Sequence, residues 1–469
     1  MALVFSTVLA AAQAAQPTSS VSAAQALQQL STNDNPLLGS VSPDKIDPNP
    51  LNLTLLGAID RGLKYNLGLI LSQQGNNFAA AARLRAFSEL LPNVSARVAD
   101  SSQQINLAAF GFPVSPGTNP IIGPFNVFDV RGAVTQNILD MSAVNRVRSA
   151  DANVAAAKFS YQNTRDLVVL AVGATYLQAL ANQSRVEAAE AEFNTATATY
   201  KQAVDQKNAG VVAGIDVLRA QVEMQARQQR LLVAQNDFDK QLLQVGRVIG
   251  IPAAQKFLLS DKIPAPAPIA ITLEIAMQRA LDSRSDYKQA EALMRAAERS
   301  RAAAQAERYP TIGFQGDYGT IGPSAVSNHG TYSAGVAAHI PIFEGGRIKA
   351  EIQQADSVLS QRKSQYDDLR GRIEFEVRSA FLDYEAATKQ LQVATSNLDL
   401  AHQQLQQARD RFASGVTNNL EVVQAQEAEA TAQENYISSL FGHNFSKLAV
   451  ARAIGVAEDA TKRFLGGKQ

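Results

Sequence analysis

The feature that most constrains this chain is a short glycine-bearing turn that occurs twice between long stretches without helix breakers. Residues 209–221 read AGVVAGIDVLRAQ, and residues 414–426 read SGVTNNLEVVQAQ. Both copies follow the pattern Gly-Val-x-x-x-[Ile/Leu]-[Asp/Glu]-Val-[Leu/Val], which indicates an internal repeat. Because glycine and proline are rare on either side, we expect each turn to join two long helices.

The repeated turn belongs to a duplication that extends over most of the chain. Three further pairs of segments match in the same order: 53–59 with 271–277, 91–92 with 309–310, and 245–250 with 450–455. We predict a first structural repeat over 53–252 and a second over 271–456, joined by a stiff linker at 253–270 that contains Pro-Ala-Pro-Ala-Pro. We read 1–15 as a secretory signal with an Ala-Gln-Ala cleavage site, 16–52 as an extended lead-in and 457–469 as a C-terminal tail.

Each repeat has the same internal order of predicted elements. A helix comes first and ends at a proline, two strands follow, and two long helices separated by the glycine turn complete the repeat. The predicted bounds are 54–90, 92–112, 126–139, 141–208 and 215–248 in the first repeat, and 272–308, 310–320, 331–343, 346–413 and 420–453 in the second. At about 1.5 Å per residue, the longest helices reach on the order of 100 Å and need lateral partners in a coiled-coil arrangement.

The predicted strands alternate between apolar and polar residues. Phe128, Val130 and Val134 point one way, whereas Asp129 and Arg131 point the other. Four strands cannot close a barrel, and an open sheet with one apolar face would aggregate. Strands from several chains in one shared barrel resolve this, with apolar residues toward lipid and polar residues toward a lumen. The alternative from another class is a soluble coiled-coil scaffold whose β-hairpins are interaction elements.

Composition argues against several other functions. Lys+Arg and Asp+Glu both number 43, so the chain lacks the net basic charge of a nucleic-acid binder. Cysteine is absent, which excludes thiolate metal sites, thiol nucleophiles and disulfides. The four histidines have no ligand spacing: His329, His339, His402 and His443. We therefore expect no metal, no cofactor and no enzyme activity.

In this order and spacing the motifs resemble those of the TolC-type outer membrane efflux proteins, over about 53–456. Two features are similar to those of the family. One is the proline that ends the first helix of each repeat, at 91–92 and 309–310. The other is the strand-to-helix junction at 340–347, which reads Ile-Pro-Ile-Phe-Glu-Gly-Gly-Arg. The resemblance implies an α+β membrane protein that forms a homotrimer. Its twelve-stranded barrel would lie in the lipid of the outer membrane of a Gram-negative-type bacterium, with a coiled-coil tunnel in the periplasm.

The resemblance also implies a passive exit duct that is opened by a periplasmic adaptor and fed by an inner-membrane transporter. We favour multidrug efflux with a resistance-nodulation pump. The alternatives are type I protein secretion and metal efflux.

In the family the two inter-helix turns form the periplasmic tip, which constricts the tunnel and docks the adaptor. Carried over by position, Asp216 and Glu421 fall where acidic aperture residues lie, and three chains would place six carboxylates around one opening. Both positions also suit helix N-terminal acids, which the helix dipole favours by ~0.3–1 kcal/mol. Adaptor docking would fall on the residues Gly210, Val211, Gly415 and Val416.

Two tip positions depart from the pattern of the family, which often closes the tip with a tyrosine and an arginine bonded to neighbouring acids. The matching residues here are Phe412 and Thr417. Phe412 can pack but cannot donate a hydrogen bond, and Thr417 carries no charge. The closing links must therefore differ. The alternatives are links through Arg409, Arg411 or Arg219, or a closed state that is held more weakly.

Overall fold

The protein is described from a computed structural model, which covers residues 35–42, 46, 48–111, 118–264, 268–414, 416–417 and 419–459. The predicted signal at 1–15, most of the lead-in and most of the tail lie outside these described residues. The chain forms two compact units. Unit 1 is built from the described parts of 1–67, 166–283 and 371–469, and unit 2 from those of 68–165 and 284–370.

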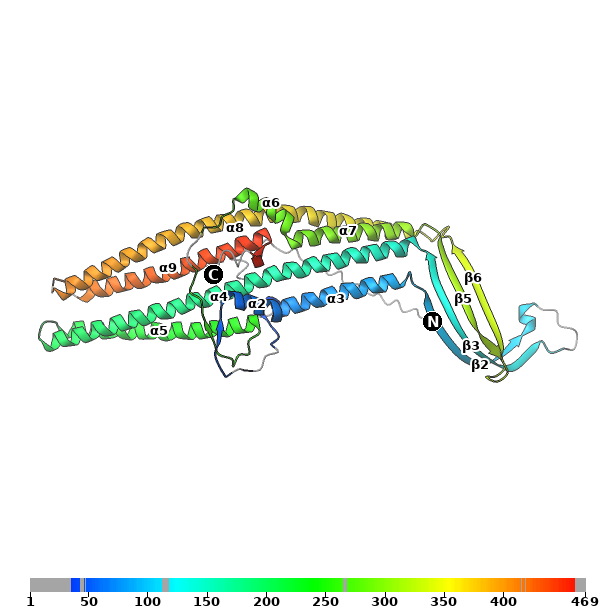
Figure 1. Cartoon of the computed structure of the whole chain (residues 1–469), viewed down its shortest axis with the longest axis horizontal. Coiled ribbons are helices and arrows are strands. Elements are labelled where there is room, and N and C mark those ends of the chain that lie inside the picture. Colours follow the sequence, from blue (N-terminus) through cyan, green and yellow to red (C-terminus); the bar gives the residue numbers. More distant parts are fainter. Residues whose placement is uncertain are drawn as a thin grey trace, which may run out of the picture. The chain divides into compact units, whose positions relative to one another are not determined.

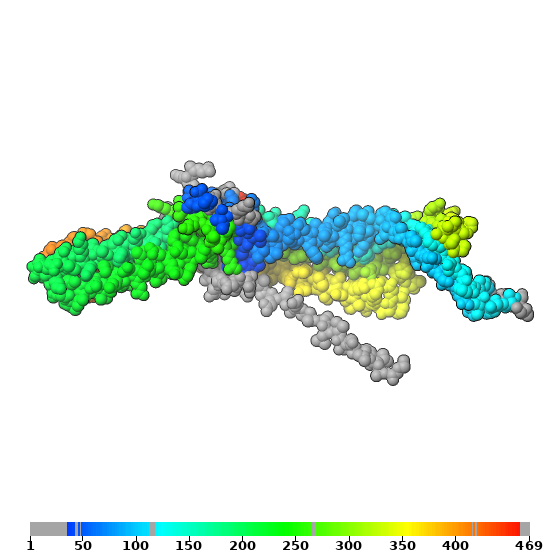
Figure 2. All heavy atoms as spheres, turned by 90° about the horizontal axis from the view of Figure 1, so that it is seen from below, coloured from blue at the N-terminus to red at the C-terminus, as the bar shows by residue number. Residues whose placement is uncertain are grey.

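Unit 1 contains two helical hairpins whose turns lie at the same end of the unit (Figure 1). The first hairpin is formed by α4 (Met141–Asn208) and α5 (Gly214–Ile249), and the second by α8 (Arg347–Ala413) and α9 (Asn419–Ile454). Both α4 and α8 begin in unit 2 and end in unit 1. Seen from below, the α4–α5 pair forms a continuous green surface toward the turn (Figure 2).

Shorter elements complete unit 1. They are the 3₁₀-helix η1 (Pro36–Leu38), the helices α2 (Leu55–Tyr65) and α6 (Leu273–Ser283), and a parallel pair of strands, β1 (Leu51–Leu53) and β4 (Phe257–Leu259). β4 falls in the predicted linker, and β1 begins in the predicted lead-in and ends at the first residue of the first repeat. Within the described part of the chain, no helix has both the length and the apolar character needed to cross a membrane.

The predicted helices 54–90 and 272–308 are each divided in two. Asn66 separates α2 from α3 (Leu67–Ser88), and Arg284 separates α6 from α7 (Ser285–Ala306). Asn66 has an extended backbone, is fully buried, and donates from its side-chain amide to the Leu37 carbonyl at 2.7 Å. Arg284 is also extended and buried, and its guanidinium donates to the Asp286 carboxylate. Buried polar side chains with their own partners thus replace helical geometry at both breaks.

The core of unit 1 is packed closely because small residues lie where helices meet. A Cβ added to Gly173 on α4 would lie 2.8 Å from a methyl group of Leu448 on α9. Three residues further along α4, the buried Tyr176 hydroxyl donates to the Leu53 carbonyl at 2.9 Å and lies 3.0 Å from the Asp261 carboxylate. Burial is the main cause that raises the pKa of Tyr176, so the phenol stays protonated and fastens β1 to α4.

Unit 2 carries an antiparallel sheet with the strand order β2-β3-β5-β6. The strands are β2 (Asn93–Asn106), β3 (Ile121–Leu139), β5 (Thr311–Gly322) and β6 (His329–His339). The strand predicted at 92–112 ends at Asn106, where the 3₁₀-helix η2 (Leu107–Phe110) follows. The strand predicted at 331–343 ends at His339. Because the order is open, β2 and β6 are the two edges of the sheet.

The register gives the sheet one polar and one apolar face. Val98 pairs with Val130, and Tyr318 pairs with Tyr332, and directly paired residues share a face. This face is exposed in the described chain, since Val98 is 69% and Tyr332 78% accessible. On the opposite face, Arg131 of β3 donates to Asp129 at 2.8 Å and to Asp317 of β5 at 3.0 Å. The alternation predicted from the sequence is therefore present in the sheet.

Candidate functional site

The first of the two turns is a Schellman motif, the glycine-ended helix stop in which two amides reach back to the last turn. Gly210 has φ 75°, in the left-handed region that favours glycine, and its amide donates to the Lys207 carbonyl at 2.9 Å. The Val211 amide donates to the Gln206 carbonyl, also at 2.9 Å. A Cβ added at Gly210 would meet no atom within 4 Å, so the turn is open to solvent on that side.

The second turn repeats part of this geometry. The Val416 amide donates to the Arg411 carbonyl at 3.0 Å. This bond reaches back five residues, as the bond from Val211 to Gln206 does in the first turn. Ser414 adds a bond from its hydroxyl to the Asp410 carbonyl at 2.7 Å. Gly415, predicted as a docking residue, lies outside the described residues.

The two predicted aperture acids occupy equivalent places at the starts of α5 and α9. Asp216 and Glu421 are both the third residue of their helices. Each has a cation beside it in its own chain, since Arg219 lies 3.3 Å from Asp216 and Arg411 lies 3.6 Å from Glu421. Thr417 also donates its hydroxyl to Glu421. Two of the three arginines considered as closing partners thus lie next to the acids.

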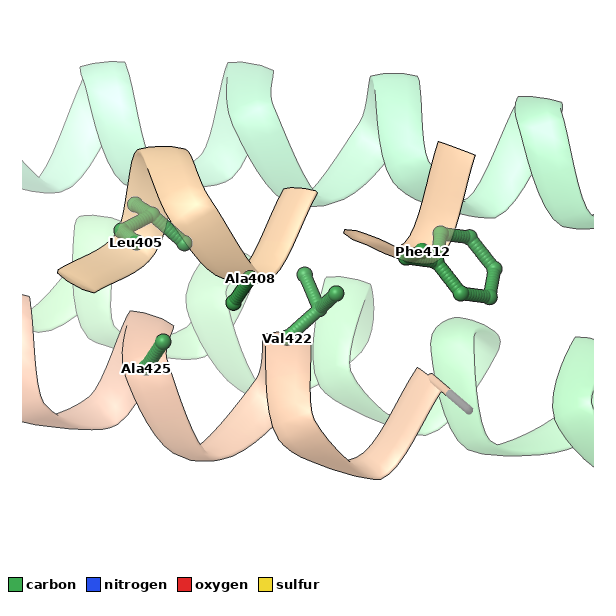
Figure 3. Packing of buried hydrophobic residues seen from close by; sticks show 5 residues of the cluster. All are labelled: Leu405, Ala408, Phe412, Val422 and Ala425. Carbon is green, nitrogen blue, oxygen red and sulfur yellow. The ribbon is translucent and has the colours of Figure 1, made fainter. Parts of the chain in front are cut away.

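Phe412 packs inside the second hairpin instead of reaching toward another element. Its side chain is 8% exposed and belongs to a small apolar cluster between α8 and α9 (Figure 3). The other members of the cluster are Leu405, Ala408, Val422 and Ala425. At the position where the resemblance predicted a tyrosine, Phe412 therefore stabilises the hairpin itself through apolar burial.

Apolar side chains are exposed around both turns. Val211 and Val416 are 71% and 70% accessible. The exposed series continues along α5 through Ile215, Leu218 and Val222. The spacing of these three residues places them on one side of the helix. Large apolar side chains in such a row on a helix surface are typical of a contact surface for another protein.

A buried arginine joins the two hairpins of unit 1. Arg227 of α5 is 2% exposed and donates to Glu192 of α4 at 2.7 Å, to Glu223 one turn earlier at 2.6 Å and to Glu427 of α9 at 2.8 Å. Arg230 also contacts Glu427, at 3.0 Å. The site was not predicted. The i,i+4 pair of Glu223 and Arg227 is visible in the sequence, but its partners on α4 and α9 are not.

The pKa values around Arg227 follow from burial and charge. Burial raises the pKa of Glu192 and outweighs the opposing effect of Arg227. Burial alone would lower the pKa of Arg227, but the hydrogen bonds and charges of Glu223 and Glu192 leave it raised. The hydrogen bond from Arg230 leads the effects that lower the pKa of Glu427. The guanidinium therefore stays charged and acts as a fixed link between hairpins.

The histidines lie apart from the turns. His402 of α8 lies 2.6 Å from Glu429 of α9, and His443 is buried near Tyr384. His329 and His339 are the first and last residues of β6. Over the described ranges, no group of three or more His, Cys, Asp or Glu side chains is arranged to hold a metal ion.

Comparisons with known proteins agree on one family. A family profile described as "Outer membrane efflux protein" matches residues 80–250 and 276–440. The toluene efflux pump outer membrane protein TtgC of Pseudomonas putida is 24% identical over 383 residues, which is 78% of this chain and 76% of TtgC. The outer membrane protein TolC of Escherichia coli is 20% identical over 343 residues, 70% of this chain and 69% of TolC.

A solved structure is similar throughout. The CmeC outer membrane channel of Campylobacter jejuni superposes with a TM-score of 0.77 over 93% of each chain, at 16% identity. The similarity shows that the two chains share a fold.

Proposed function

This chain belongs to the outer membrane efflux protein family, and from that premise we propose that it is the exit duct of a tripartite export system. It is a transport protein of the outer membrane and not an enzyme. The observation that carries the proposal is the sheet of unit 2, which exposes an apolar face and has open edges at β2 and β6.

In this proposal three chains close a twelve-stranded barrel by pairing β2 of one copy with β6 of the next. Closure satisfies the unpaired backbone groups of both edges, which lipid cannot do. The apolar face then contacts lipid and the polar face surrounds the lumen. The contacts of Arg131 with Asp129 and Asp317 support this orientation, because the charges on the polar face are matched across neighbouring strands.

The turns of the two hairpins form the periplasmic tip, and Asp216 and Glu421 surround its aperture. Threefold symmetry gives six carboxylates, which attract cations and repel one another. Arg411 is the best candidate to hold the tip closed. Its side chain is 57% exposed and lies 3.6 Å from Glu421. Arg411 can therefore leave its ion pair with Glu421 and form one with an acid of a neighbouring copy. Phe412 and Thr417 support the hairpin and orient Glu421 instead of forming the closing link.

A periplasmic adaptor docks on the residues of the two turns: Gly210, Val211, Gly415 and Val416. The open space over Gly210 and the exposed side chains of Val211 and Val416 support this assignment. Small residues beside exposed apolar side chains let another helical hairpin approach closely. Adaptor binding opens the tip if it is stronger in the open state than in the closed one.

We assign the duct to small-molecule efflux driven by an inner-membrane pump of the resistance-nodulation type. The name of TtgC, a toluene efflux pump protein, supports small apolar cargo for a relative of this chain. The pump and adaptor, not the duct, select most of the cargo in this arrangement.

Replacing Asp216 and Glu421 together with alanine tests the aperture. Loss of six carboxylates from the trimer should lower cation-over-anion selectivity in planar bilayers by roughly twofold or more, since charged rings set local ion concentrations. The matched control is Glu374→Ala, which removes an exposed α8 acid that lies 3.1 Å from Arg378. Unchanged selectivity and conductance in the double variant, or an equal change in the control, would contradict the aperture.

A further inference from the structure

Unit 1 contains a cavity in the seam between its two hairpins. Its volume is about 370 Å³, and it is lined by residues of α4, α8 and α9 and by Arg227 of α5. Its polar lining residues other than Arg227 are Glu192, Thr195, His402, Arg409, Gln426, Glu429 and Gln433. A cavity of this size holds a small organic molecule, not only a single water.

Most charged side chains that face the cavity already have a partner. The Glu192 carboxylate accepts from Arg227 at 2.7 Å, and Arg227 is further occupied by two other acids. The Glu429 carboxylate lies 2.6 Å from the His402 ring nitrogen. Arg409 differs from these groups, because it forms no ion pair with any residue of the described ranges and is only partly exposed. A half-buried guanidinium without a counter-ion attracts an anion.

The second unsatisfied group is an amide. Gln426 is 6% exposed, and neither its side-chain nitrogen nor its side-chain oxygen has a hydrogen-bond partner among the described residues. Buried amides are almost always hydrogen-bonded, so an unpartnered one in a cavity wall indicates a ligand position. Arg409 and Gln426 lie toward the hairpin turns, on α8 and α9. Ala188 and Ala191 give the α4 wall an apolar surface.

We propose that this cavity binds small organic carboxylates, with the carboxylate on Arg409 and the Gln426 amide nitrogen and the apolar body against Ala188 and Ala191. A guanidinium matches a planar carboxylate through two parallel hydrogen bonds. Glu192 and Glu429 also line the cavity and would repel a multiply charged anion. The site therefore selects a singly charged organic acid over phosphate.

Because the site lies between the two hairpins, ligand binding is coupled to the packing of the hairpins against each other. Ala188 and Ala191 belong to the first hairpin, whereas Arg409 and Gln426 belong to the second. A ligand that contacts both hairpins favours the arrangement in which they lie together, and separation of the hairpins must weaken binding by the same factor. Organic acids thus stabilise the packed seam.

Benzoate binding to the detergent-solubilised full chain tests the proposal by isothermal titration calorimetry. Benzyl alcohol, which has the same ring without the charge, and inorganic phosphate serve as comparison probes. Benzoate should bind, and Arg409→Gln should weaken binding roughly tenfold or more through loss of a charged hydrogen-bond pair. Gln426→Leu should weaken it less. Arg378→Gln, on the same helix but outside the cavity, should bind as the unaltered chain does.

Three results would overturn the proposal. The first is that benzoate does not bind up to about 10 mM, a concentration beyond useful ligand affinity. The second is that benzyl alcohol or phosphate binds as tightly as benzoate does. The third is that Arg409→Gln binds benzoate as tightly as the unaltered chain does. Circular dichroism and the elution volume of each variant establish that it folds as the unaltered chain does. If Arg409→Gln does not fold, Ala191→Leu replaces it, because filling the cavity should abolish benzoate binding.

Discussion

Lys447 of α9 provides a direct test of the energetics of unit 1. The residue is 1% exposed, and its Nζ has no hydrogen-bond partner among the described residues. Burial lowers the pKa of Lys447 from 10.5 to about 8. The folded chain therefore binds this proton more weakly than the unfolded chain does. At ~1.4 kcal/mol for each tenfold change in proton affinity, the buried ammonium lowers the free energy of unfolding by about 3 kcal/mol.

Replacing Lys447 with methionine removes the charge and keeps an unbranched chain of similar length. At pH 7 the amine is protonated in both states, so the variant should gain up to about 3 kcal/mol in the free energy of unfolding. Between pH 8 and 10.5 the unfolded chain holds the proton and the folded chain releases it, so the stability of the unaltered protein rises with pH. The advantage of the variant should shrink across this window and disappear above it.

Guanidinium titrations of the detergent-solubilised protein, followed by far-ultraviolet circular dichroism at about pH 7 and about pH 10.5, measure this difference. Lys389→Met is the matched control, because Lys389 is exposed on α8 and its loss should change stability by less than ~0.5 kcal/mol. A variant that is destabilised at pH 7, or stabilised equally at both pH values, would refute the reasoning.

Two further substitutions test the seam and the first turn. Arg227→Met leaves three acids without their shared partner and should lower the free energy of unfolding by about 3–5 kcal/mol. The control is Arg230→Met, which changes a side chain that is 49% exposed. It should lower the free energy of unfolding by about 1 kcal/mol or less in the same titrations. A loss of similar size in both would contradict a buried link. Gly210→Ala should cost about 1–2 kcal/mol because φ is 75°, although no atom obstructs the new Cβ. Its thermal midpoint should fall below that of Gly214→Ala, where φ is not positive; equal midpoints would remove backbone strain as the cause.

Features that depend on local chemistry were predictable from the sequence. Gly210 stands between two stretches without helix breakers, and a left-handed residue that ends a helix is nearly always glycine. Residues 128–131 of β3 and 332–336 of β6 alternate between apolar and polar or small residues, and alternation places side chains on opposite faces whatever the rest of the chain does. The turns and the two faces of the sheet therefore needed no tertiary information.

Features that depend on distant residues were not predictable. Asn66 and Arg284 interrupt helices without any glycine or proline signal at the break itself. Asn66 does so because its buried amide finds the Leu37 and Val248 carbonyls, which lie far away in the sequence. Arg227 has one visible partner at i,i+4, but the acids on α4 and α9 meet it only when the hairpins pack. For Asn66 and Arg227 the partners that are distant in the sequence decide the outcome.

The sheet with two open edges has a consequence for biogenesis. β2 offers 14 residues of backbone at one edge and β6 offers 11 at the other, and no described segment of the same chain covers either edge. If copies of the chain pair edge to edge as proposed, the last folding step has a rate that depends on concentration. Newly made subunits then partition between productive encounter and edge-to-edge misassociation. Overproduction would then speed both the productive encounter and the misassociation, so the yield would depend on the competition between them.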